Sequence, residues 1–339
     1  MEDKRYNNGI PSSEIAERKP ALPKRVNWNK LALVFILLGA ALVGIGSITG
    51  TRGGGLYFTN GRFQVLNTVN ESSFTPIPDG FDLKYVTVNG NSIRVIVEPT
   101  PWGRDNGVEV VNVSEHEVKF NDDGGIVVNA RNTGSHSGWA VMNFSNPLRN
   151  EIRISLPAGK NLDTLNVTCT SGSIRIDGMN AHNITAVANS GAIRLNDSQA
   201  ENFTARATSG VIRGDNLRFT DGNFQTSSGG ITLSNTHWQN LEVRCTSGVV
   251  RVTESQVINP ASGTTTLQTS SGGVTLGIRG NRHDYNYSVS TSSGTARVNG
   301  ESIFNGSIDT TSNLTANAGS GNHQISIRTT SGYARLNFE

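Results

Sequence analysis

Arginine recurs at one position of a repeated phrase and is the side chain in this sequence best suited to binding chemistry. It stands three residues after a glycine in six of eight copies, and threonine takes the position in the other two. A guanidinium group presents a rigid fork of donors that matches carboxylate and phosphate. If the copies stack, the arginines form an outward stripe suited to an anionic wall polymer, lipid headgroup or nucleic acid. The stripe consists of Arg175, Arg194, Arg213, Arg251, Arg297 and Arg335.

A purely structural interpretation of the arginines is also open. Like charges about 5 Å apart on neighbouring strands cost a few tenths of a kcal/mol per pair. The nearby acids Asp177, Asp197 and Asp215 would offset that cost, and residues 161–339 contain twelve arginines and twelve acidic residues. In this interpretation the arginines keep the surface soluble and discourage aggregation.

No motif in the sequence indicates catalysis, a metal site or a cofactor. The six histidines lack metal-ligand spacing, and neither Cys-x-x-Cys nor Gly-x-Ser-x-Gly occurs. The run 121–125 (Asn-Asp-Asp-Gly-Gly) resembles a calcium-binding turn but lacks further ligands, so a hydrophilic turn is the simpler interpretation. Enzymes that cleave polysaccharides need paired carboxylates on one face, whereas the acids here are scattered. We therefore expect a protein that is not an enzyme.

The glycines of the repeated phrase set its period. Five of them stand nineteen residues apart, and apolar residues alternate on both sides of each Ser-Gly pair. Such alternation is typical of half-buried strands, and glycine supplies the conformation that a sharp corner needs. Nineteen residues suit one coil of a parallel β-solenoid (β-helix), with coils about 4.8 Å apart. The glycines are Gly172, Gly191, Gly210, Gly229 and Gly248, followed at looser spacing by Gly272, Gly294 and Gly332. The sequence thus predicts an all-β fold with a regular solenoid over residues 161–339.

The only two cysteines, Cys169 and Cys245, occupy the same position of the repeat, four coils apart. At about 4.8 Å per coil they would be about 19 Å apart, beyond the reach of a disulfide. Small residues share their position in other repeats. We expect two buried free thiols.

The N-terminal part of the chain predicts membrane anchoring. Residues 1–30 hold seven lysines and arginines against four acids, and residues 31–48 are apolar and uncharged. This run is long enough to cross a bilayer, and its basic flank predicts a cytoplasmic N-terminus and an extracytoplasmic C-terminal part. A cleaved signal peptide is the alternative, because 44–46 (Gly-Ile-Gly) has the form of a cleavage site.

Between the predicted span and the repeats lie two further segments. Residues 49–57 are rich in glycine and predict a flexible linker. Residues 58–160 contain strand-like runs punctuated by prolines and end in the alternating run 151–157 (Glu-Ile-Arg-Ile-Ser-Leu-Pro). We expect an irregular β-region that caps the open N-terminal edge of the solenoid.

This ordered array resembles the DUF4097 family, a group of adhesin-like β-strand repeat proteins of bacterial membranes and surfaces. The resemblance rests on the Leu-Pro-terminated strand 151–157, the serial x-Ser-Gly-x-Ile-x-Ile phrases, and the last phrase within 324–336. It covers roughly residues 80–338. The resemblance implies a membrane-anchored or secreted β-solenoid and supplies no catalytic residues.

Together these features predict a non-catalytic, single-pass membrane protein of the bacterial cell surface. Its solenoid would act as an adhesin or as a scaffold for envelope components. The expected partners are cell-envelope polymers or surface proteins, with the membrane contacted through 31–48 and no specific nucleic acid. An accessory role in envelope-stress signalling is the alternative, and a polysaccharide-active enzyme fits less well.

Overall fold

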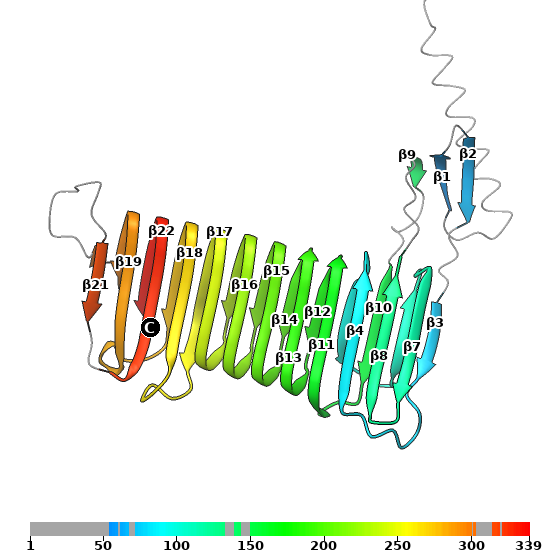
Figure 1. The fold of residues 1–339 in the computed structure, drawn as a ribbon, viewed down its shortest axis with the longest axis horizontal. Coiled ribbons are helices and arrows are strands. Elements are labelled where there is room, and N and C mark those ends of the chain that lie inside the picture. Colours follow the sequence, from blue (N-terminus) through cyan, green and yellow to red (C-terminus); the bar gives the residue numbers. More distant parts are fainter. Residues whose placement is uncertain are drawn as a thin grey trace, which may run out of the picture.

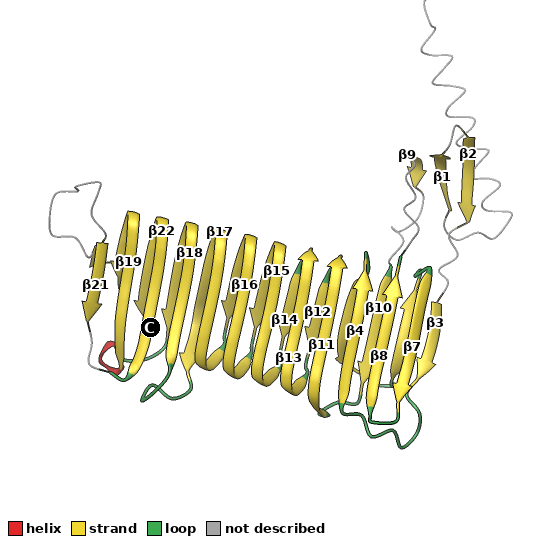
Figure 2. Cartoon of the chain, viewed as in Figure 1, coloured by secondary structure: helices red, strands yellow, loops and turns green. Residues whose placement is uncertain are grey.

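The protein is a row of stacked β-coils (Figure 1). The computed structural model describes residues 54–59, 62–67, 72–132, 139–143, 150–299, 301–302, 314–318 and 321–339. Apart from one short 3-10 turn (Arg282–Asp284), the regular elements of these residues are strands (Figure 2), which confirms the all-β prediction. The predicted membrane helix 31–48 and its flank 1–30 lie outside the described residues. Among the residues described, no helix is long and apolar enough to span a membrane.

The central coils follow one another in chain order. Each begins with a strand that leads to the Ser-Gly corner and continues with a strand beyond it. Neighbouring coils pair in parallel, and as far as residue 257 the shift is nineteen residues, so that Ile174 pairs with Ile193 and Ile193 with Ile212. This confirms parallel stacking for the repeats. The strands are β11 (Asn161–Ser171), β12 (Ile174–Asp177), β13 (Asn180–Ser190), β14 (Ile193–Asn196), β15 (Gln199–Asp215), β16 (Arg218–Ser234), β17 (His237–Val257) and β18 (Thr264–Ile278).

The core is a set of apolar columns, one residue per coil, as the alternation predicts. The column five residues before the glycine is fully buried in the central coils. Phe203, Phe219 and Phe224 form an aromatic cluster, with ring centroids 5.7–6.0 Å apart. Burying one such side chain contributes about 1.5–3 kcal/mol, and the stack repeats this gain with every coil.

Glycine is required at the Ser-Gly corner for two separate reasons. Gly191 has a φ of 141°, a conformation that residues with a side chain rarely adopt. A Cβ atom on Gly191 would also lie only 1.5 Å from the carbonyl oxygen of Gly172 in the neighbouring coil. The same contact recurs along the glycine column, which explains why the glycine is kept in every repeat.

A second corner follows six residues after the glycine. Asp197, Asn216, Asn235 and Glu254 adopt left-handed conformations there, with φ between 49° and 53°. The next position is buried and holds a hydroxyl in several coils. The Oγ of Ser198 donates to the carbonyl of Asn196 (2.7 Å) and accepts from the amide of Met179 (3.2 Å). These bonds tie this corner to the one in the preceding coil, and Ser255 makes the same two contacts with Thr253 and Thr236.

The N-terminal end of the stack departs from chain order. β4 (Tyr85–Asn91) and β5 (Arg94–Pro99) stack in parallel on β11 and β12. β8 (Gly125–Arg131) and β10 (Glu151–Leu156) come later in the chain but stack on the other edges of β4 and β5. Residues 85–99 therefore lie between two later segments. The antiparallel strands of this end are β3 (Ser72–Pro76), β6 (Gly107–Val111) and β7 (Glu115–Asn121).

The C-terminal end shows the same kind of inversion. β22 (His323–Phe338) is the last strand in sequence, yet it lies between β18 and β19 (Tyr285–Val298) and pairs in parallel with both. β20 (Glu301–Ser302) and β21 (Leu314–Ala318) pair with β19 in antiparallel fashion. A separate three-stranded sheet contains β1 (Gly54–Thr59), β2 (Arg62–Asn67) and β9 (Trp139–Asn143).

The main sheet is thus mixed, and the prediction of a parallel solenoid over 161–339 is wrong at the C-terminal end, where β20 and β21 are antiparallel. The antiparallel strands at the N-terminal end lie within residues 58–160, for which an irregular β-region is predicted. An antiparallel strand pairs with the outermost coil while the chain turns back, which covers an edge that would otherwise be open.

The prediction for the cysteines is confirmed. Cys169 and Cys245 are both free and buried, and they stand in one column with three other residues between them. Burial raises the pKa of both thiols, which disfavours the reactive thiolate.

Candidate functional site

The pairing register places the six arginines of the predicted stripe in one column, here called the arginine ladder. Arg175, Arg194 and Arg213 are in direct succession. Beyond them the order is Thr232, Arg251, Thr275, Arg335 and Arg297, because β22 lies before β19 in space. All of the ladder arginines except the half-buried Arg175 are exposed.

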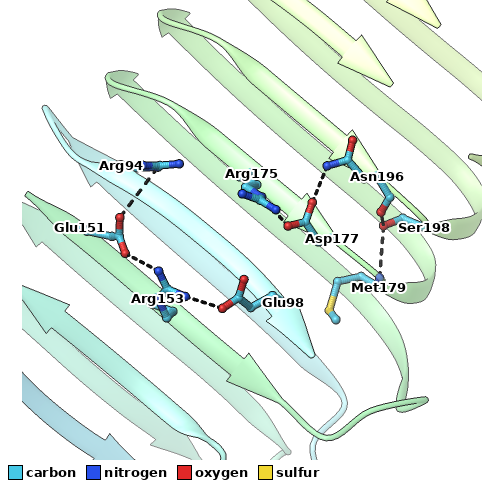
Figure 3. A network of polar contacts seen from close by, with 9 residues as sticks. All are labelled: Arg94, Glu98, Glu151, Arg153, Arg175, Asp177, Met179, Asn196 and Ser198. Carbon is cyan, nitrogen blue, oxygen red and sulfur yellow. Dashed lines mark hydrogen bonds and ion pairs between the residues drawn. The ribbon is translucent and has the colours of Figure 1, made fainter. Parts of the chain in front are cut away.

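The ladder arginines differ in how their charge is balanced. Arg175 forms an ion pair with Asp177, whose second oxygen accepts from the Nδ2 of Asn196 at 2.6 Å (Figure 3). Among the described residues, the other five ladder arginines form no ion pair. Asp197, proposed from sequence as a counter-charge, accepts instead from the Nδ2 of Asn216 (2.7 Å). The guanidinium groups beyond Arg175 are therefore available to a ligand.

Arg153 stands in the same column, two positions beyond Arg175 toward the N-terminal end. Its guanidinium lies 2.6 Å from Glu98 and 2.9 Å from Glu151 (Figure 3), and Glu151 is also 3.8 Å from Arg94. Burial opposes the charge of Arg153, but its bonds to Glu151 and Glu98 outweigh that effect and raise its pKa. These charges are balanced by one another through ion pairs within the protein, so the network is structural.

The structure reveals a second basic column that the sequence analysis missed. It lies four residues before the glycine, on the strand that precedes the corner, and arginine alternates there with glutamine over five coils. Arg244 is paired with Glu242 at 2.7 Å, whereas Arg206 and Arg328 form no ion pair within the described part of the chain. The column is Arg206, Gln225, Arg244, Gln268 and Arg328. The alternation of arginine and glutamine can be seen in the sequence when the repeats are aligned on their glycines.

Hydroxyl groups line the edge of this second column next to the corner. The residue two before each glycine is Thr246, Ser270 or Thr330 in the coils that carry Arg244, Gln268 and Arg328. Together these side chains line a hollow of about 380 Å³. Guanidinium, amide and hydroxyl donors converge there, which is the donor set that an anionic group requires. Within the described residues, no group of three or more His, Cys, Asp or Glu side chains is placed to hold a metal ion.

Comparison with known proteins gives a match to one family and distant likenesses to solved structures, two of which follow. The model of the Toastrack DUF4097 family matches residues 106–337. No curated protein matches the chain. A candidate cell adhesion protein from Clostridium sporogenes is 12% identical, with a TM-score of 0.27 over 80% of this chain and 100% of its own. A candidate lipid binding protein from Parabacteroides distasonis is 12% identical, with a TM-score of 0.24 over 79% of this chain and 97% of its own.

Proposed function

The chain belongs to the Toastrack DUF4097 family, and we propose that it is a non-catalytic scaffold that binds anionic polymers of the bacterial cell envelope. The binding surface is the arginine ladder together with the second basic column around the Ser-Gly corner. Contacts of this kind are individually weak and sum along a repetitive ligand.

The observation that carries this proposal is the row of exposed arginines without ion pairs among the described residues. Arg194 and Arg213 stand on adjacent coils, about 4.8 Å apart along the axis. Arginines placed only for solubility would gain by pairing with nearby acids, and Asp197 is instead held by Asn216. The positive charges of guanidinium groups on neighbouring coils repel one another when no acid balances them, and a bound polyanion offsets that repulsion.

The proposal includes the place of the protein in the cell. Residues 31–48 cross the membrane once, residues 1–30 are cytoplasmic, and the solenoid stands outside. The composition of 1–48 supports this arrangement, since a basic segment precedes an uncharged apolar run of eighteen residues. A solenoid held in this way presents its columns to the polymers that surround the membrane.

The test is retention of the full chain, in lipid nanodiscs, on immobilised linear polyphosphate, with uncharged dextran as the reference matrix. The variant Arg194→Gln/Arg213→Gln/Arg251→Gln should bind about tenfold more weakly, because three exposed contacts of about 0.5 kcal/mol each are lost. Its affinity should also fall less steeply with salt.

The matched control is Arg104→Gln/Arg218→Gln/Arg279→Gln, which removes the same charge from exposed arginines outside both columns. It should bind polyphosphate like the unmodified protein. Equal losses in the two triple variants would show that net charge alone accounts for retention, and the proposed surface would be wrong.

A further inference from the structure

A polar groove runs along the stack on the strand that precedes the Ser-Gly corner. Its axis follows the buried position seven residues before the glycine, beside a column of side chains six residues before the glycine that are half-buried in all eight coils. The hollow is best defined over four coils, with a volume of about 360 Å³. We call this part the acceptor groove. Its walls are Asn202, Asp221 and Asn240 in one column and Thr204, Asn223 and Glu242 in the other.

Hydrogen bonds between coils hold the walls in place. The Nδ2 of Asn202 donates to Asn183 (2.9 Å), and the Nδ2 of Asn240 donates to Asp221 (2.8 Å). On the opposite wall, the Nδ2 of Asn223 donates to Glu242 (2.8 Å). Each of these amides thus donates one hydrogen bond to the side chain on a neighbouring coil. This bond fixes the orientation of the amide and lowers the entropy lost when a ligand binds.

The hydrogen-bonding capacity that remains is mostly that of acceptors. One carboxylate oxygen of Asp221 and the amide oxygens of Asn202 and Asn223 have no partner among the described residues. A ligand that fits must therefore bring donors at short, regular intervals. The hydroxyl groups of a sugar chain meet that demand, and consecutive coils about 4.8 Å apart offer one set of acceptors after another.

The charge of the groove separates it from the arginine ladder. Glu242 is balanced by Arg244 at 2.7 Å, whereas Asp221 forms no ion pair within the part of the chain that is described. The local charge is thus about one negative unit, which repels a polyanion. The two surfaces suit different ligands, so either can bind without the other.

We propose that the acceptor groove is a binding site for a neutral, hydroxyl-rich glycan chain. Asp221 and the oriented amides accept from sugar hydroxyls, and the buried Phe203 and Leu241 form the floor between the walls. The proposal goes beyond binding of anionic polymers and does not depend on the ladder arginines.

The experiment measures binding of cellotetraose, a linear chain of four β-linked glucose units, to the full chain in lipid nanodiscs by isothermal titration. Tetraethylene glycol is the matched probe, because its chain offers ether acceptors and almost no donors. Cellotetraose should bind and tetraethylene glycol should not. Equal binding of both probes, or no binding of cellotetraose, would overturn the proposal.

Two variants locate the site. Asp221→Asn keeps the shape and replaces an acceptor by a donor, so it should weaken binding of cellotetraose about tenfold, the value of one hydrogen bond to a charged group. Thr164→Val stands in the same column three coils away, outside the groove, and should leave the affinity unchanged. Equal affinities of Asp221→Asn and the unmodified protein would exclude the acceptor groove as the site. Asp221→Asn should bind polyphosphate as the unmodified protein does. The two binding measurements therefore test the acceptor groove and the arginine ladder separately.

Discussion

The central coils and the two ends of the stack are built on different principles. From β11 to β18 each coil pairs with the next one in the chain, and as far as β17 the same contacts return every nineteen residues. At the ends, residues 85–99 lie between later segments, and β22 lies between β18 and β19. The repeated phrase therefore determines which side chains of a coil face inward, but it does not determine which other coil stacks next to it.

The difference arises because every coil presents the same register to both of its neighbours. A coil with glycine at its corner fits above or below any other, so Gly332 takes the place between Gly272 and Gly294. What distinguishes the ends is their single, non-repeated contacts. Arg153 with its glutamates marks one end, and the buried His323 marks the other.

The largest effect is expected from a change in the glycine column of the central coils. In Gly191→Ala, the new Cβ would meet the carbonyl of Gly172 at 1.5 Å on a backbone with positive φ. We expect a loss of more than about 4 kcal/mol of unfolding free energy, measured by urea titration of the full chain in nanodiscs.

Gly103→Ala is the control for this change. Gly103 also has a positive φ (80°), but no atom lies within 4 Å of the Cβ position. It should lose only about 1 kcal/mol, the cost of the backbone conformation alone. Similar losses in both variants would show that contact between coils is not what requires glycine.

The next effect concerns the non-repeated network at the N-terminal end. Arg153→Met leaves the buried Glu151 with only the more distant Arg94. We expect a loss of about 2–3 kcal/mol in the same urea titration, because an uncompensated buried charge is costly. Arg175→Met in the regular column breaks one half-buried pair with Asp177, whose carboxylate keeps its hydrogen bond from Asn196, and should cost less than about 1 kcal/mol. A larger loss for Arg175→Met would remove the distinction between the end and the repeats.

The C-terminal end should respond to pH through His323. Its Nδ1 bonds the carbonyl of Ser262 (2.8 Å) and its Nε2 bonds the Oγ of Thr265 (2.9 Å), which also accepts from Trp238. Burial lowers the pKa of His323 below its ordinary value of about 6.5, although the bond to Ser262 acts in the opposite direction. As the pH is lowered, this histidine therefore binds a proton at a higher pH in the unfolded chain than in the folded protein. The free energy of unfolding consequently falls as the pH drops below about 6.5.

The measurement is the urea midpoint between pH 7.5 and pH 5. His323→Gln should remove part of the decline on the acid side. His182→Gln, which replaces an exposed histidine paired with Glu201, should retain the contribution of His323. An identical pH dependence in the His323 variant and the unmodified protein would rule out this histidine as a contributor.

These contrasts also indicate what the sequence could predict. The period of Gly172 to Gly248, the inward columns, the outward arginines and the free cysteines all follow from alternation and spacing. The second basic column was equally visible in Arg206, Arg244 and Arg328, but it lies before the corner, where the residues vary more between repeats. The inverted order of the ends was not predictable, because pairing partners with identical register are equivalent in sequence.

The smallest effect concerns the second corner, where the repeats differ among themselves. Asp197, Asn216 and Asn235 are residues that tolerate the left-handed conformation, whereas Glu254 adopts it (φ 53°) without that advantage. Glu254→Asn should therefore raise the unfolding free energy by about 0.5–1 kcal/mol, measured by urea titration. Asn235→Asp, which exchanges two tolerant residues at the equivalent corner, should change stability by less than about 0.5 kcal/mol. If Glu254→Asn gives no gain, the corners are shaped by the stacking of the coils rather than by the preferences of their own residues.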